Sequence, residues 1–411
     1  MLPQPLLPPE APRSRRLAFR GLALLLGPDH APALRPLFVL RLLSTIAFAG
    51  FWTYLGIWAI QQLGASPATV GTIFLANAVV WTVFSWLGGL LSDRIGRKPV
   101  LVVGTLGQAL CLFALAPVGH NVLLGVGIVM ASSVFNAPAQ AATNALVADL
   151  VPEEQQEEAY AGTRVASNLG AALGPPLAAG MLALGGWGAV MAGAAALGVG
   201  SAVFAYRMLP AIALPAHARP ERTLRTVLAD SPFMLLLVSA LLASSVYVAY
   251  ETVLPVVAVS SYALPASLWG LLLVINPLLV TLFQLRLTSA VARYSAGRRL
   301  VVAMALMGGP FLLLLWDTSV PTLIVVLIVF VVGEMLWAPT SQAIAARLAP
   351  APLRGAYMGA YGVSSSVSFM LAPFGFLHLR AHAGDGTMWL AVGGVALVAA
   401  VAGVVAARAA D

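Results

Sequence analysis

Charged residues inside long apolar stretches are the side chains of this sequence with the clearest potential for chemistry. Glu334 stands near the middle of one such stretch, Glu251 lies in a second and Arg41 in a third. An ionisable group inside a bilayer is costly unless it is paired or hydrated. A carboxyl group can take up and release a proton, so we expect Glu334, and after it Glu251, to bind protons, with Arg41 as a partner in that coupling. The alternatives are that the acids only form hydrogen bonds between helices and that Arg41 extends to the membrane surface.

Two of the apolar stretches are separated by a short charged run, Gly89-Leu-Leu-Ser-Asp93-Arg94-Ile-Gly96-Arg97-Lys98. So many charges cannot lie in hydrocarbon. The run therefore predicts a short hydrated loop between two membrane helices.

A series of small residues and prolines falls in the apolar stretch 158–183. Its members are Gly162, Gly170, Gly174 and Pro175. Small residues let neighbouring helices approach closely, and proline bends a helix axis. We expect this segment to pack tightly, and the series alone leaves open whether it also bears on transport.

Polar and aromatic residues within the stretches are candidates for the lining of a cavity. Asn136, Gln140 and Asn144 are spaced four apart, which places them on one face of a helix. Tyr250 and Trp337 offer aromatic walls for an amphipathic ligand. For each aromatic residue the alternative is core packing or a place at the membrane interface.

The composition determines which elements hold these residues. Sixty percent of the 411 residues are hydrophobic and 9% are charged, too few charges to cover a soluble surface. About 20 apolar residues cross a bilayer core of about 30 Å as a helix, and the runs here are continuous rather than alternating. We predict an all-α membrane protein with twelve transmembrane helices, at about 36–62, 67–91, 99–117, 122–150, 158–183, 186–208, 232–260, 266–290, 300–316, 320–349, 354–378 and 387–408.

The basic residues indicate the sidedness of these helices. Nearly all loop arginines fall on one side, and Arg380 is the exception. The positive-inside rule then places both termini in the cytoplasm, with the chain in the cell membrane. The net charge of +7 is thereby explained as an orientation signal, which argues against nucleic-acid binding. Residues 1–35, rich in proline and arginine, are expected to form a cytoplasmic tail rather than a signal peptide.

An internal repeat divides the chain into two similar halves. Pro152 and Pro175 are separated by 23 positions, as are Pro350 and Pro373. We therefore expect two pseudo-symmetric six-helix bundles, 36–208 and 232–411, joined by a cytoplasmic linker at 209–231. The second half repeats the end of the charged run as Gly297-Arg298-Arg299, but Tyr294 stands where the first half has Asp93.

The charged run resembles the loop between helices 2 and 3 of the major facilitator superfamily. The glycine series resembles the antiporter motif of its drug-efflux branch, although one spacing is a residue short. The resemblance implies that Asp93 caps the helix opened by Arg354, that Arg97 pairs with Asp149, and that this cluster latches the cytoplasmic gate. The alternative is that these charges only set the topology. The stretch 126–136 lacks the arginine that proton-coupled members often carry there, so either another basic residue such as Arg41 serves in its place or the coupling differs.

The resemblance implies a secondary active transporter that works by alternating access. We expect proton-coupled efflux of small amphipathic compounds, and the alternative is another cargo, such as a sugar, metabolite or lipid, with or without proton coupling. The sequence has no phosphate-binding loop and a single cysteine, Cys111. No cofactor, metal site or enzymatic activity is therefore expected. The expected partners are a small-molecule substrate, protons and the lipid bilayer, and the expected state is a monomer.

Overall fold

The computed structural model describes residues 34–150, 153–210, 227, 229–350 and 354–410. Within these residues all regular structure is helical, and ten helices are long and apolar enough to cross a membrane. The chain is therefore an all-α, multi-pass membrane protein. The expected tail, apart from its last residues, and most of the expected linker at 209–231 lie outside the described residues.

The first part of the chain forms six helices, several of which match a predicted span closely. They are α2 (Leu34–Trp52), α3 (Leu55–Gln61), α4 (Pro67–Ile95), α5 (Arg97–Leu115), α6 (Val122–Leu150) and α7 (Glu153–Met208). The predicted span 36–62 is broken between α2 and α3. The long helix α7 is interrupted at Gly186, whose φ of +66° lies outside the helical range, between the predicted spans 158–183 and 186–208.

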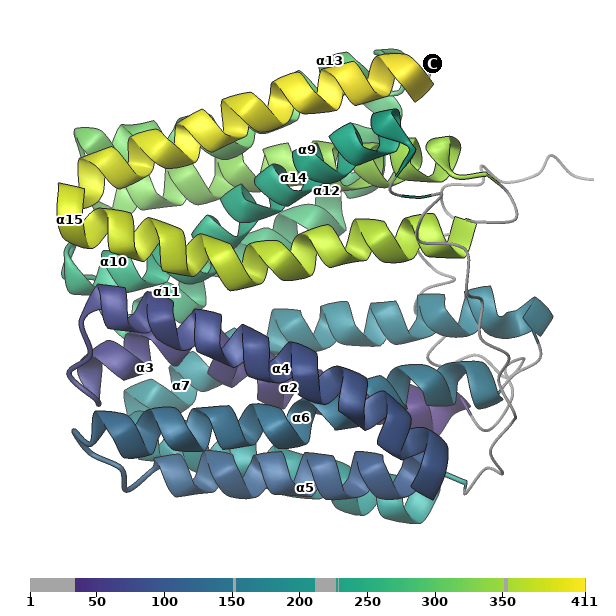
Figure 1. The fold of residues 1–411 in the computed structure, drawn as a ribbon. Helices are drawn as coiled ribbons and strands as arrows, with labels where there is room; N and C mark the ends of the chain where they lie inside the picture. Colours follow the sequence, from purple (N-terminus) through teal and green to yellow (C-terminus); the bar gives the residue numbers. More distant parts are fainter. Residues whose placement is uncertain (1–33, 151–152, 211–226, 228, 351–353, 411) are drawn as a thin grey trace, which may run out of the picture.

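The second part of the chain contains further helices and two local departures from α-helical geometry. In order they are α9 (Ser231–Val248), the π-helical turn η1 (Ala249–Val253), α10 (Leu254–Ser260), α11 (Ala266–Leu272), α12 (Ile275–Val291), α13 (Ala296–Gly308), the 3₁₀ turn η2 (Gly309–Leu315), α14 (Val320–Leu348) and α15 (Arg354–Ala410). Figure 1 shows α15 doubling back on itself, and its non-helical residue is Gly384, at φ +83°.

The helix ends follow local sequence signals. The hydroxyl of Ser66 accepts a hydrogen bond from the backbone N–H of Thr69 at 3.1 Å, and Pro67 opens α4. Both residues are favoured at these positions because a cap supplies an acceptor and proline has no N–H to leave unpaired. At the other end, Gly96 is the single residue between α4 and α5. Its φ of +101° is a backbone conformation that glycine adopts readily, and it ends the first helix.

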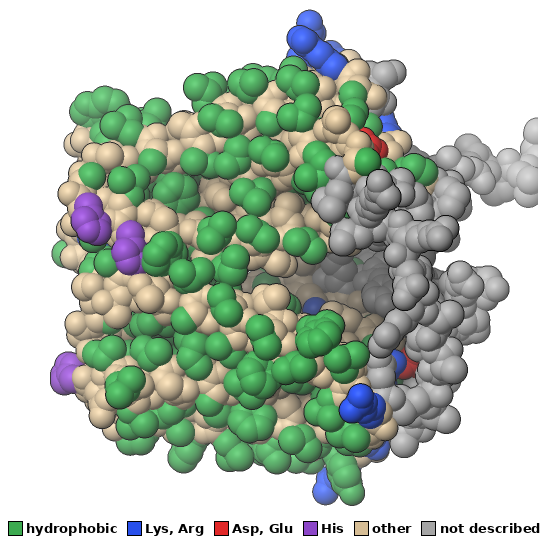
Figure 2. All heavy atoms as spheres, in the orientation of Figure 1, with side chains coloured by type: hydrophobic (Ala, Val, Ile, Leu, Met, Phe, Trp, Pro, Cys, Tyr) green, Lys and Arg blue, Asp and Glu red, His purple; other side chains and the backbone are tan. Residues whose placement is uncertain are grey.

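The surface is that of a protein surrounded by lipid. Figure 1 shows the helices up to α7 on one side of the molecule and those from α9 onward on the other. Hydrophobic side chains cover the face in Figure 2, and large apolar side chains such as Leu184, Leu123 and Leu397 are more than two-thirds exposed, as expected of a surface in contact with lipid. On this face lysine and arginine gather at the end that carries the C-terminus, whereas histidines lie at the opposite end.

Candidate functional site

The second part of the chain contains a cavity bordered by Glu334. This cavity of about 210 Å³ is lined by four aromatic side chains and by three further polar ones. The aromatic ones are Tyr247, Trp337, Tyr361 and Phe369, and the polar ones are Ser244, Gln342 and Ser365. Asn276, at the start of α12, donates a hydrogen bond from Nδ2 to Oε2 of Glu334 on α14 at 2.7 Å. The sequence thus predicted the acid and one aromatic wall, Trp337, but gave no sign of the amide that holds the acid.

The second acid, Glu251, lies in the π-helical turn that separates α9 from α10. Pro255 explains this turn, because it has no N–H to donate to the carbonyl of Glu251 four residues earlier. The N–H of Leu254 bonds instead to the carbonyl of Ala249, five residues back. Glu251 is close enough to Glu334 for the two carboxyl groups to interact electrostatically. The fold therefore brings together the two acids that the sequence singled out.

Tyr250 does not serve as the open cavity wall that the sequence suggested. Its ring is buried and stacks on Phe330, with centroids 4.3 Å apart and planes 5° from parallel. Tyr247 borders the cavity in its place. The rings of Tyr247 and Tyr250 lie next to each other, with centroids 6.3 Å apart.

Arg41 borders a separate, smaller cavity in the first part of the chain, and its guanidinium is hydrogen bonded there rather than to the acids. It donates to Ser167 Oγ at 2.7 Å and to Gln140 Oε1. Asn136 lines the same cavity, whose volume of about 20 Å³ suits a single water molecule. Asn136 and Gln140 thus lie at a cavity, as predicted, whereas Asn144 is exposed.

The charged run holds one of the pairs that the resemblance implied. Nε of Arg97 lies 3.0 Å from Asp149 Oδ2, and the two side chains are only 5% and 7% exposed. Arg97 also donates to Ser92 Oγ, while Lys98 donates to the backbone carbonyl of Leu209 at the end of α7. These contacts tie the α4–α5 turn to α6 and α7.

The remaining residues of the run occupy varied settings. Arg94 is exposed, and the side chains of Asp93 and Arg354 lie outside what the structure describes, so the expected cap on α15 stays a prediction. A Cβ at Gly89 would meet no atom within 4 Å, whereas one at Gly88 would lie 2.3 Å from the Cα of Pro138. The close helix contact here is thus made by Gly88, which the sequence did not single out.

The glycines of α7 are the places where α2 packs against it. A Cβ at Gly162 would lie 2.4 Å from the ring of Phe38, and one at Gly170 would lie 2.7 Å from Cβ of Thr45. At Gly174 a Cβ would meet the backbone of Gly50 and Ile46, both at 2.8 Å. Pro175 follows, buried inside the helix. The expected tight packing is confirmed.

Segments from the two parts of the chain meet closely at one end of the molecule. A Cβ at Gly71 on α4 would lie 2.8 Å from the carbonyl oxygen of Pro373 on α15, and one at Gly56 would lie 2.5 Å from Val256. Gly71 is near the start of α4, far from Gly96. Figure 1 shows α4 and the first part of α15 diverging toward the other end, and Figure 2 shows a hollow between them there.

This arrangement matches a family found by comparison with known proteins. A family model described as Major Facilitator Superfamily matches residues 37–373. The chain belongs to the major facilitator superfamily. It is a membrane transporter, as the sequence predicted from its charged loop.

Individual relatives of this major facilitator chain are distant. The "Uncharacterized MFS-type transporter YqjV" of Bacillus subtilis (strain 168) is 23% identical over 318 residues, 76% of this chain and 77% of the relative. The "Multidrug resistance protein MdtH" of Klebsiella pneumoniae (strain 342) is 25% identical over 327 residues, 79% and 80% of the two chains. A crystal structure of a mutant peptide transporter POT has a TM-score of 0.76 at 15% identity, covering 93% of this chain and 96% of that one. That structural likeness concerns the fold alone.

Proposed function

We propose that this transporter exports small amphipathic compounds in exchange for protons. The observation that carries the proposal is Glu334, an acid at a cavity that four aromatic side chains also line. Aromatic faces attract both apolar groups and cations. A carboxylate among such faces fits a compound with an apolar body and a positive charge. The name of the MdtH relative, a multidrug resistance protein, points in the same direction.

The hydrogen bond to Glu334 is compatible with such an exchange. Asn276 donates to Oε2, an oxygen that can accept a hydrogen bond whether the carboxyl group is charged or neutral. The acid can therefore gain or lose a proton without losing this partner. In the proposed cycle a proton and a cationic substrate neutralise the same buried charge in turn, since leaving it uncompensated is costly. Glu251, close by in the π-helical turn, serves as a second proton acceptor.

We further propose that the chain crosses the membrane twelve times, in two six-helix bundles at 36–208 and 232–411. The interruptions of α7 at Gly186 and of α15 at Gly384 support this count, because each of these helices is long enough for two crossings. The gathering of lysine and arginine at the C-terminal end supports a cytoplasmic location for that end, in a bacterial inner membrane. On this reading, the close contacts at Gly71 and Gly56 seal the outer side, and the bundles are open toward the cytoplasm.

The charged run is the proposed latch for the opposite, outward-open state. The Arg97–Asp149 pair fixes the geometry of the α4–α5 turn within the first bundle. When the cytoplasmic side closes, Asp93 would reach the start of α15 at Arg354. A carboxylate at a helix N-terminus is stabilised by roughly 0.3–1 kcal/mol. Rocking of the bundles would thereby make and break this contact.

The test is dye transport in everted vesicles under an imposed pH gradient, with the wild type compared with Glu334→Gln. Glutamine keeps the shape and can still accept from Asn276, so the substitution removes the ionisable group and its charge but keeps this hydrogen bond. Asp317→Asn, which changes an exposed loop acid, is the matched control. We expect gradient-driven uptake of a cationic dye by the wild type and the control, and none by Glu334→Gln. Undiminished gradient-driven uptake by Glu334→Gln would refute the assigned role.

A second candidate is transport of a polar or anionic compound, and the first-half cavity favours it. Arg41, Gln108, Asn136 and Gln140 line that cavity, and all four carry hydrogen-bonding groups. At about 20 Å³ the cavity has room for one water molecule, so this candidate requires it to widen when the bundles move. The same vesicles separate the two candidates. If no dye moves under any gradient but a labelled sugar or organic anion does, and Arg41→Gln stops that movement, the second candidate replaces the first.

A further inference from the structure

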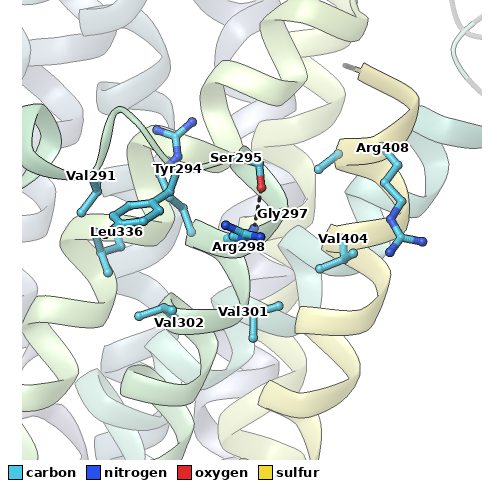
Figure 3. A pocket seen from close by; sticks show the side chains of 12 residues that line it. Val291, Tyr294, Ser295, Gly297, Arg298, Val301, Val302, Leu336, Val404 and Arg408 are labelled. Carbon is cyan, nitrogen blue, oxygen red and sulfur yellow. Dashed lines mark hydrogen bonds between the residues drawn. The ribbon is translucent and has the colours of Figure 1, made fainter.

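A groove on the surface of the second half, at the end that carries the C-terminus, is not used by the proposed transport cycle. It lies where the start of α13 meets the end of α15, and it has a volume of about 580 Å³. That volume falls within the roughly 300–1,000 Å³ of typical small-molecule sites. Figure 3 shows Arg298 and Arg408 from the two helices, together with Val301, Val302 and Val404 on the walls.

The groove combines a basic rim with apolar walls. Arg298 and Arg408 are exposed, and Arg299 beside them has its Nε buried without a hydrogen-bond partner in the described part of the chain. Among the described residues no ion pair joins these three arginines to a carboxylate. Val301 and Val302 are about half exposed, 46% and 50%, so the walls continue into the lipid-facing surface.

The internal repeat explains why these arginines lack acidic partners. Arg298 occupies the position of Arg97, which is paired with Asp149 in the first half. When the halves are aligned on Leu150 and Leu348, Arg347 occupies the position of Asp149. When the loops are aligned on Gly96 and Gly297, Tyr294 occupies the position of Asp93. The second half has therefore kept the cations of the loop without the two acids of the first half. In the described part of the chain no carboxylate pairs with these arginines, which leaves them available to an external anion.

We propose that the groove binds an anionic phospholipid. Its phosphate would lie between Arg298 and Arg408, since a guanidinium group binds phosphate oxygens through two parallel hydrogen bonds. One acyl chain would lie along Val301, Val302 and Val404. Basic pockets between membrane helices at the cytoplasmic surface are suited to such head groups. The apolar walls, open to the bilayer, are the reason to choose a lipid over a free anion. This inference does not depend on the transported substrate.

Native mass spectrometry of the purified full-length protein tests the proposal, with phosphatidylglycerol titrated into a neutral detergent. The test variant is Arg298→Gln/Arg408→Gln. The matched control is Arg207→Gln/Arg286→Gln, which removes two exposed arginines elsewhere and so has the same net charge. We expect the tightest lipid adduct to weaken about 30-fold in the test variant, from the loss of two arginines at the membrane surface, and to persist in the control. Equal weakening in both variants, or in neither, would overturn the site.

A second variant and a competition separate lipid from free phosphate. Val404→Trp fills the apolar wall and leaves every arginine in place, so we expect it to weaken phosphatidylglycerol binding as well. Inorganic phosphate at millimolar concentration should leave the adduct intact. If phosphate displaces the lipid and Val404→Trp has no effect, the groove is an anion site and the lipid assignment is wrong. Because these readouts measure binding, a failure here would leave the transport proposal standing.

Discussion

Replacing Gly174 by alanine should force α2 and α7 apart. A Cβ at this position would lie 2.8 Å from the backbone nitrogen of Gly50 and 2.8 Å from the backbone oxygen of Ile46. Ordinary van der Waals contact of a Cβ begins at 3.4 Å, so restoring it would require the helices to separate by about 0.6 Å. Both obstacles are backbone atoms, which cannot rotate away as a side chain can. Overpacking of this kind costs about 1–3 kcal/mol.

The same helix provides the control for this prediction. A Cβ at Gly180 would meet nothing within 4 Å, so Gly180→Ala changes helix propensity as Gly174→Ala does, but without a collision. Thermal unfolding of the purified protein, followed by tryptophan fluorescence, should show a lower midpoint for Gly174→Ala than for Gly180→Ala. Equal midpoints would refute the packing argument. If Gly174→Ala unfolds normally but fails to transport, the glycine series acts in transport rather than in packing.

Three further outcomes are expected. Asp93→Asn should abolish dye transport with unchanged expression and thermal unfolding, because the latch loses its charge; normal transport in the vesicle assay would contradict this role. Gly88→Ala should lower the unfolding midpoint, whereas Gly89→Ala should not, since only Gly88 abuts a proline of α6. Hydrogen bonds, first from Thr322, hold the pKa of Asp317 below its ordinary value of 3.8. The ionised carboxylate of Asp317 therefore contributes its full stabilisation above pH 3.8, the ordinary pKa. This contribution is lost as the pH falls through the lowered pKa of the folded protein. A carboxyl NMR titration should show this pKa rise in Thr322→Val.

The helices and their approximate ends could be predicted from the sequence because both follow local signals. Apolar length sets the spans, and caps such as Ser66 with Pro67 mark their starts. The boundaries near Gly186 and Gly384 were also predicted, since the chain must turn where two spans adjoin. The partner of Arg97 followed from the family resemblance, and the structure confirms the Arg97–Asp149 contact.

Contacts that depend on the relative placement of helices could not be predicted in this way. Asn276 lies 58 residues from Glu334, and nothing in the local sequence links them. Tyr250 packs on Phe330, the alternative that the sequence left open for each aromatic residue, and which aromatic side chains line the cavity depends on how the helices pack. Gly88 was missed because the family pattern draws attention to Gly89, while the actual contact depends on where Pro138 lies across from it.

The single-residue connection between α4 and α5 has a mechanical consequence. With only Gly96 between the two helices, and with Arg97 held to Asp149, the chain has almost no slack at this turn. Any tilt of α4 must be passed on to α5, so the two helices would act as a rigid lever that moves the charged turn as one body. Probes placed at positions 90 and 102 should therefore keep a fixed separation, whichever way the transporter faces.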